Sequence, residues 1–202
     1  MKKNILITGV NGQVGTKLYD YLNQISGFKI IASDIGENIY GFSTYEKLDV
    51  TNRKDITNVV KKHKINEIYH LAAILSSAGE QNNQLAWDVN MNGLMNVLCV
   101  SRDCRVNRFF YPSSIAVFGG PFTDGIAHQN LLSTPTTMYG INKLAGENLC
   151  NYFNKSFNMD IRSLRYPGII GPENNAGGGT TDYAVEIFHD AVEQGSYDCF
   201  LS

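Results

Sequence analysis

Two kinds of hydrophobic pattern alternate along the chain. Short continuous apolar runs predict buried strands, and segments with apolar residues three or four positions apart predict amphipathic helices. Strands are expected at residues 5–8, 28–33, 45–50, 67–72, 108–113 and 161–166. Helices are expected from the glycines after residue 8 to near Gly27, and at residues 54–63, 83–104, 138–153 and 181–194. This alternation is typical of βαβ units and predicts an α/β fold with a doubly wound parallel sheet of the Rossmann type.

The same pattern divides the chain into two unequal parts. Residues 1–167 carry all the predicted strands and are expected to form one Rossmann domain. Residues 168–202 are expected to begin a substrate-binding lobe, and the strand-like end at residues 200–202 indicates that this lobe is incomplete. The stretch 119–136, rich in Gly, Pro, Thr and Ser, predicts a surface loop between strand and helix.

Composition narrows the class of protein. The net charge of the 202 residues is −2, so no basic excess attracts nucleic acid. No apolar run approaches the roughly 20 residues of a membrane-spanning helix, and the first run is too short for a signal peptide. The four cysteines form no Cys-x-x-Cys pair, and the four histidines are scattered. We therefore expect a cytoplasmic protein with free thiols, no metal, and neither nucleic acid nor membrane as a partner.

A glycine turn after the first predicted strand indicates a phosphate-binding site. In Gly9-Val10-Asn11-Gly12-Gln13-Val14-Gly15, Gly9 permits a tight turn, Gly12 lets the backbone approach a pyrophosphate, and Gly15 allows close packing of helix and strand. The helix that starts here offers free N–H groups and a positive dipole end. The cofactor contacts predicted in this turn are Gly9, Asn11, Gly12, Gln13, Val14 and Gly15.

An acidic residue at the end of the second predicted strand completes this signal. Asp34 follows Gly15 by roughly 20 residues, the spacing of an acid that binds the adenosine ribose. Its carboxylate would accept hydrogen bonds from the ribose hydroxyls and repel a 2′-phosphate, which favours NAD over NADP. The alternative is an Asp that only caps a turn.

A second group of residues predicts proton transfer. Tyr139 and Lys143 lie four residues apart in a predicted helix, so both side chains project from one face. An ammonium group and the positive nicotinamide ring would both lower the pKa of the phenol, which is near 10 when unperturbed. A hydroxyl from Ser114, at the end of the fifth predicted strand, would hold the reacting oxygen. Ser113 competes for this role, and taken alone the Tyr/Lys pair is an ordinary helix pair.

In this order, these motifs resemble the extended short-chain dehydrogenase/reductase family over essentially the whole chain. The Gly-x-x-Gly-x-x-Gly spacing, Leu48-Asp49-Val50, His70-Leu71-Ala72-Ala73 and Asn90-Met91-Asn92-Gly93 match family motifs. The resemblance implies a Ser114/Tyr139/Lys143 catalytic constellation, favours Ser114 over Ser113, and places Asp49 and Val50 beside the adenine. The further cofactor contacts that it implies are Leu71, Ala72, Ala73, Asn90, Tyr139, Lys143, Tyr166 and Pro167.

Two further segments point to a substrate class. Residues 168–172 with 177–185, and residues 75–80 with 86–88, resemble the short-chain-type L-threonine dehydrogenases. The hydroxyls of Thr180 and Thr181 at a helix start would suit an amino-acid carboxylate, and Asp182 could face its ammonium group. The alternative is an ordinary capped helix. The resulting set of substrate contacts is Ser76, Ser114, Tyr139, Thr180, Thr181 and Asp182.

The resemblance implies a reaction: oxidation of the C3 hydroxyl of L-threonine by NAD to 2-amino-3-oxobutyrate. It also implies a homodimer that pairs the helices expected at residues 83–104 and 138–153. Two alternatives stay open at this point. One is an NAD-dependent nucleotide-sugar epimerase or dehydratase, and the other is a non-catalytic NAD-binding module.

Overall fold

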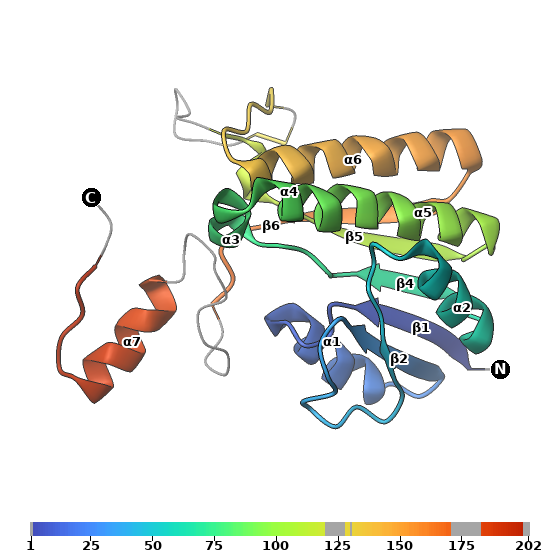
Figure 1. Cartoon of the computed structure of the whole chain (residues 1–202), viewed down its shortest axis with the longest axis horizontal. Helices are drawn as coiled ribbons and strands as arrows, with labels where there is room; N and C mark the ends of the chain where they lie inside the picture. The colour runs from blue at the N-terminus through green and yellow to red at the C-terminus, as the bar shows by residue number, and fades with distance from the viewer. Residues whose placement is uncertain (1, 120–127, 130, 171–182, 200–202) are drawn as a thin grey trace.

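The computed structural model describes residues 2–119, 128–129, 131–170 and 183–199. Six parallel strands form one sheet in the order β3-β2-β1-β4-β5-β6 (Figure 1). The strands are β1 (Lys3–Thr8), β2 (Phe28–Asp34), β3 (Tyr45–Lys47), β4 (Glu67–His70), β5 (Arg108–Ser114) and β6 (Asp160–Tyr166). The larger helices are α1 (Gln13–Asn23), α2 (Arg53–His63), α5 (Leu94–Asp103), α6 (Met138–Phe157) and α7 (Tyr183–Glu193). The prediction of a doubly wound parallel α/β sheet is confirmed.

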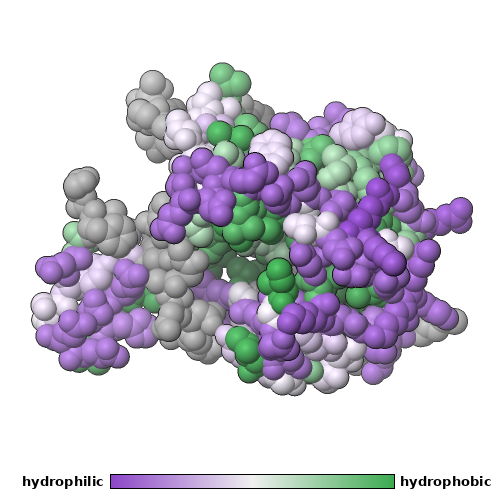
Figure 2. Space-filling model, viewed as in Figure 1, coloured by the Kyte–Doolittle hydropathy of each residue, from purple (hydrophilic) through white to green (hydrophobic). Residues whose placement is uncertain are grey.

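The strand order reverses beside β1, which fixes where a ligand can bind. The chain runs outward from β1 through β2 to β3 and then crosses back to β4 on the other side of β1. In open α/β sheets the crevice at such a switch point, at the carboxyl ends of the strands, is the usual ligand site. Figure 2 shows a hollow lined by apolar residues in the middle of the visible face.

Alternation along each strand builds two hydrophobic cores. Because successive strand residues point to opposite faces, Ile5 and Ile7 of β1 pack under α1 with Tyr19, whereas Leu6 packs with the cluster under α2, α5 and α6. Helices therefore cover both faces of the central strands, which explains why these strands have continuous apolar runs. No helix in the described part of the chain is long and apolar enough to cross a membrane.

The helix predicted for residues 83–104 is confirmed as a continuous helical segment from Asn83 to Asp103. It consists of α4 (Asn83–Trp87), a π-helical turn η1 (Asp88–Gly93) and α5, and a short helix α3 (Ser76–Gln81) that was not predicted precedes it. The Asn82 side chain accepts the Leu85 N–H at 3.0 Å and so begins α4 separately from α3. The six residues of α3 are too few to show an apolar period, so the pattern did not predict this helix.

The sheet is less covered at its β6 end. Leu164 of β6 is 57% exposed, and none of the residues of α7 is buried. Figure 1 shows α7 standing away from the layers of the sheet. The prediction of a helix at residues 181–194 is confirmed for 183–193, and this helix makes little contact with the core.

Candidate active site

The predicted glycine turn has the close contacts that require glycine at two of its three positions. Gly9 has a φ of +70°, and a Cβ there would lie 2.6 Å from the Ala72 backbone N. A Cβ on Gly15 would lie 2.5 Å from the Gly9 carbonyl oxygen, so α1 packs directly against the turn. A Cβ on Gly12 would meet only the Gly9 oxygen, at 3.4 Å. Gly12 therefore leaves open space, as a backbone that approaches a pyrophosphate requires.

The start of α1 is suited to an anion. Gly12 caps the helix without a side-chain hydrogen bond, and the first turn, which begins at Gln13 and Val14, holds no acidic residue. The N–H groups of this turn and the positive end of the helix dipole are thus not neutralised by a neighbouring carboxylate of the helix.

Asp34 ends β2 beside the glycine turn. Its Oδ2 accepts the Asn11 backbone N–H at 3.1 Å, and its Oδ1 accepts the Gly36 N–H at 3.1 Å. The Asn11 side chain donates to the Glu37 carbonyl, but its own Oδ1 is buried with no partner within the described residues. A fixed carboxylate beside an unsatisfied acceptor fits the hydroxyl groups of a ribose. The turn-capping role considered for Asp34 is also present, in its bond to Gly36.

The two residues predicted to lie beside the adenine, Asp49 and Val50, follow β3. One carboxylate oxygen of Asp49 accepts both the N–H and the hydroxyl of Thr51 at 2.8 Å. Val50 is buried, and a Cβ on Gly93 would lie 2.8 Å from its Cγ2. Close packing between this loop and η1 therefore fixes the position of Asp49 and Val50.

The segment that leaves β4 is tied to the glycine turn. The Thr8 hydroxyl lies 2.9 Å from Nδ1 of His70, and the Ala72 N–H donates to the Thr8 hydroxyl at 3.4 Å. Burial, assisted by the positive charge of Lys143, lowers the pKa of His70 to about 3, so the imidazole is neutral at pH 7. These bonds hold Leu71 and Ala72 next to Gly9, and Ala73 follows directly in the chain.

Asn90 holds the same segment from the other side. Its Oδ1 accepts the Ile74 N–H at 2.8 Å, and its Nδ2 donates to the Ile74 carbonyl at 3.0 Å and to Asn142 Oδ1 at 3.3 Å. Both N–H groups of the amide are thus engaged inside the protein. Asn90 therefore connects η1 with the segment after β4 and with α6. Its predicted contact with the cofactor stays a prediction.

Ser114, Tyr139 and Lys143 meet at the carboxyl end of β5. Tyr139 is in the first turn of α6 and hydrogen-bonds with Ser114, the last residue of β5. The Lys143 Nζ lies one turn further on, 5.3 Å from the centre of the Tyr139 ring, and donates to the Pro112 carbonyl at 2.7 Å. The sequence pattern does not reveal this carbonyl partner, because a backbone acceptor has no residue signature.

The start of α6 is fixed by its own cap and by a close neighbour. The Thr137 hydroxyl accepts the Gly140 N–H at 3.0 Å, which caps the helix. A Cβ on Gly140 would lie 2.5 Å from the Ala116 carbonyl oxygen, in the 3₁₀ turn η2 (Ile115–Val117) that follows Ser114. The absence of a side chain at Gly140 lets the turn that carries Tyr139 lie directly against the strand end that carries Ser114.

Burial dominates the proton affinities of this group. It raises the pKa of Tyr139, while the hydrogen bond with Ser114 acts in the opposite direction. Burial lowers the pKa of Lys143 to about 8, so the amine is mostly protonated at pH 7. Without a bound cofactor the phenol is therefore neutral, and the predicted lowering of its pKa concerns the complex with NAD.

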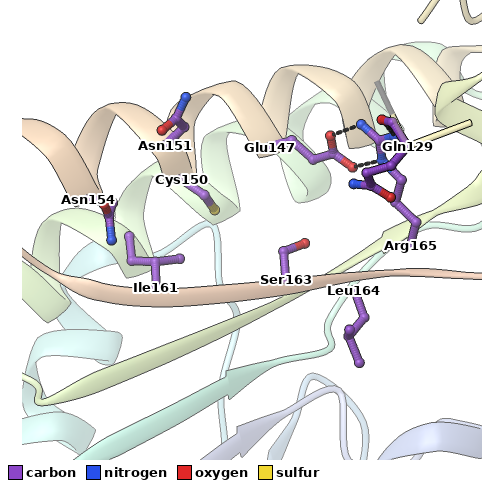
Figure 3. Close-up of a pocket in the computed structure, with 9 residues that line it drawn as sticks. All are labelled: Gln129, Glu147, Cys150, Asn151, Asn154, Ile161, Ser163, Leu164 and Arg165. Atoms are coloured by element: carbon purple, nitrogen blue, oxygen red, sulfur yellow. Dashed lines mark hydrogen bonds and ion pairs between the residues drawn. The ribbon is translucent and has the colours of Figure 1, made fainter. Parts of the chain in front are cut away.

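Ser113 faces the opposite side of β5 from Ser114. Its hydroxyl donates to Glu147 at 2.5 Å, and Glu147 pairs with Arg165 of β6 through two bonds of 2.8 Å. Figure 3 shows this pair in a pocket of about 440 Å³ between α6 and β6. Neither Tyr139 nor Lys143 lines that pocket. Ser114, rather than Ser113, is the serine that hydrogen-bonds with Tyr139.

The remaining predicted residues are placed only in part. Ser76 begins α3, and Tyr166 ends β6 opposite Ser114, with Pro167 directly after it. Thr180, Thr181 and Asp182 lie outside the described residues. Within the part of the chain that the structure describes, no group of three or more His, Cys, Asp or Glu residues is arranged to hold a metal ion.

The sequence of this chain matches a family model and is similar to proteins of that family. The model of the NAD dependent epimerase/dehydratase family matches residues 5–196. An uncharacterized epimerase/dehydratase of Staphylococcus haemolyticus is 44% identical over 205 residues, which cover 99% of this chain and 64% of that protein. This chain thus spans a little under two thirds of the length of that relative.

Two solved structures are similar over nearly the whole chain. A monomeric L-threonine 3-dehydrogenase from a metagenome, in its apo form, is 46% identical with a TM-score of 0.92, covering 98% of this chain and 64% of that one. A GalE-like L-threonine dehydrogenase from Cupriavidus necator, in its holo form, is 44% identical with a TM-score of 0.92, covering 98% and 65%.

Proposed function

Because this chain belongs to the NAD-dependent epimerase/dehydratase family, we propose that it is a dehydrogenase that oxidises the C3 hydroxyl of L-threonine to 2-amino-3-oxobutyrate. The observation that carries the proposal is the Ser114/Tyr139/Lys143 group at the carboxyl end of β5, at the same edge of the parallel sheet as the glycine turn that follows β1. The likeness to L-threonine dehydrogenases supports this substrate over a nucleotide sugar.

NAD supplies the hydride acceptor of this reaction. The glycine turn and the start of α1 would hold its pyrophosphate, and Asp34 its adenosine ribose. A 2′-phosphate would meet the Asp34 carboxylate, so NAD is favoured over NADP. Asp49 and Val50 would lie on the adenine side. The nicotinamide side would be lined by Leu71, Ala72, Ala73, Tyr166 and Pro167.

The side chains of the constellation have separate tasks. Ser114 would hold the C3 oxygen by a hydrogen bond, and Tyr139 would accept its proton. Because burial opposes formation of the phenolate, Tyr139 needs nearby positive charge, which the Lys143 ammonium and the bound cofactor provide. Ser76, Thr180, Thr181 and Asp182 would bind the amino-acid end of the substrate.

We further propose that the protein is a cytoplasmic homodimer. Leu85 of α4, Met95 of α5 and Ile141 of α6 are exposed apolar residues on the helices expected to pair. All four cysteines are free thiols, as a reducing compartment would keep them. Light scattering during size-exclusion chromatography tests the dimer, and a single-chain mass would contradict it.

The test of the activity is formation of NADH, followed by its absorbance, with L-threonine or UDP-galactose as the added substrate. The proposal predicts an increase with L-threonine and none with Tyr139→Phe, in which the proton acceptor is removed while NAD binding persists. Conversion of UDP-galactose without net NADH would identify a nucleotide-sugar epimerase instead. NAD binding with no turnover of either substrate would contradict the dehydrogenase and favour a binding module.

A further inference from the structure

The first turn of α6 is hydrogen-bonded to a helix that is distant in the sequence. The Glu80 Oε1, in α3, accepts the backbone N–H of Met138 at 2.6 Å. Met138 is the first residue of α6 and the neighbour of Tyr139. The first N–H groups of an α-helix have no partner inside the helix, so Glu80 satisfies one of them. Because the first turn of α6 holds no acid of its own, Glu80 also places a negative charge near the positive end of the helix.

Helix α3 has its own supports. The Gly79 N–H donates to the Leu75 carbonyl at 2.7 Å, and Gly79 is buried against α4, where a Cβ would lie 3.5 Å from the Ala86 Cβ. Directly after α3, Asn82 caps α4. The carboxylate of Glu80 therefore projects from a segment that is held by neighbouring backbone and core contacts.

The turn that carries Tyr139 is thus held from two directions. On one side Gly140 lies against the Ala116 carbonyl, beside the Ser114 end of β5. On the other side Glu80 binds the Met138 N–H. The contacts of Gly140 and Glu80 therefore both act on the turn that brings Tyr139 to its hydrogen bond with Ser114.

We propose that Glu80 is a positioning residue for Tyr139. It links the C-terminal end of α3, the helix whose first residue is Ser76, to the proton acceptor. The inference rests on the proposed function, because that function gives Tyr139 its role. The Glu80 carboxylate accepts a backbone N–H next to Tyr139, so its proposed action is on the placement of Tyr139. Its acceptor oxygen is the important feature, and an amide oxygen in the same place would serve in part.

Two substitutions separate the acceptor from the side chain. Glu80→Ala removes the bond, and Glu80→Gln keeps an oxygen that accepts the Met138 N–H. We expect Glu80→Ala to lower kcat with L-threonine about 10-fold, because small misplacements of reacting groups are costly, with KM for NAD unchanged. Glu80→Gln should recover most of kcat, and Asp20→Ala on the exposed side of α1 should equal the wild type. Wild-type kcat in Glu80→Ala, or an equal loss in Glu80→Gln, would overturn the proposal.

A second measurement does not depend on the reaction. Amide hydrogen exchange at Met138, followed by NMR on the protein without substrate, should be about 10-fold faster in Glu80→Ala than in the wild type, and close to the wild type in Glu80→Gln. Unchanged exchange in Glu80→Ala would overturn the role of Glu80 whatever the substrate is. If the two variants show this exchange pattern but the wild-type protein oxidises no L-threonine, the result would contradict the proposed function and support the positioning contact.

Discussion

The glycine-turn end and the β6–α7 end of the molecule are built in different ways. Around β1, helices cover both faces of the sheet, and Gly9 and Gly15 lie so close to neighbouring backbone that a single added carbon would collide with it. At the other end, β6 is covered by α6 on one face, and Leu164 points from the opposite face (Figure 3). None of the residues of α7 is buried.

The difference shows which properties the described contacts can determine. The glycine-turn end is fixed by its own packing, so we expect the proposed NAD site to form independently of α7. At the β6–α7 end, none of the described residues of β6 or α7 is buried. The stability of this chain should therefore depend on the covered sheet and hardly at all on α7, and the next four predictions measure this contrast.

The largest effect is expected from a buried aromatic residue of the covered sheet. Phe109 of β5 is 1% exposed within the larger core cluster. Phe109→Ala should lower the free energy of unfolding by about 3–5 kcal/mol, because it removes buried apolar surface and leaves a cavity. Urea unfolding measures this value. A loss below about 1 kcal/mol would show that this core is not packed as described.

The glycines of the turn should separate folding from cofactor binding. Gly15→Ala places a carbon 2.5 Å from the Gly9 carbonyl and should cost about 1–3 kcal/mol of stability as well as NAD binding. Gly12→Ala meets no such contact, so it should keep stability within about 0.5 kcal/mol and still weaken NAD binding about 10-fold, because the methyl group occupies the approach of the pyrophosphate. Unfolding and calorimetric titration with NAD test both variants. Equal losses of stability would contradict the distinction.

The buried histidine should make stability depend on pH. Because the pKa of His70 is lowered to about 3 in the folded chain, the unfolded chain binds a proton below about pH 6.5 that the folded chain does not bind. This contribution to stability is present above pH 6.5 and is lost as the pH falls towards 3, by up to about 1.4 kcal/mol per pH unit. His70→Asn should lose that part of the pH dependence in urea unfolding between pH 4.5 and 7. His189→Asn, on exposed α7, should retain the wild-type dependence.

The smallest effect is expected in α7. Phe188 is 69% exposed, so Phe188→Ala should change the free energy of unfolding by less than about 0.5 kcal/mol. Urea unfolding of Phe188→Ala and Phe109→Ala compares the effect of the same Phe-to-Ala change in the two regions. A large loss in Phe188→Ala would show that α7 packs on the sheet in solution.

Much of the fold follows from sequence pattern, and the reasons differ between elements. The apolar runs of β1 and β2 and the glycine turn between them are local signals, and the predicted bounds lie within two residues of those observed. The pattern did not predict α3, because six residues are too few to show an apolar period. It placed η1 inside a helix but did not predict its π-helical turn, because the turn has no apolar period of its own. The contacts of Lys143 with the Pro112 carbonyl and of Glu80 with the Met138 N–H depend on tertiary placement and involve backbone atoms, which no residue pattern reports. The roles predicted for the site residues stay predictions until variants are measured.

The most direct test of the proposed reaction follows the hydride itself. L-Threonine deuterated at C3 is incubated with the protein and NAD, and the reduced cofactor is analysed by mass spectrometry. The proposed function predicts one deuterium in each NADH formed with the wild-type protein, and no NADH with Tyr139→Phe. NADH without deuterium, or no reduced cofactor from the wild-type protein while NAD is bound, would contradict it.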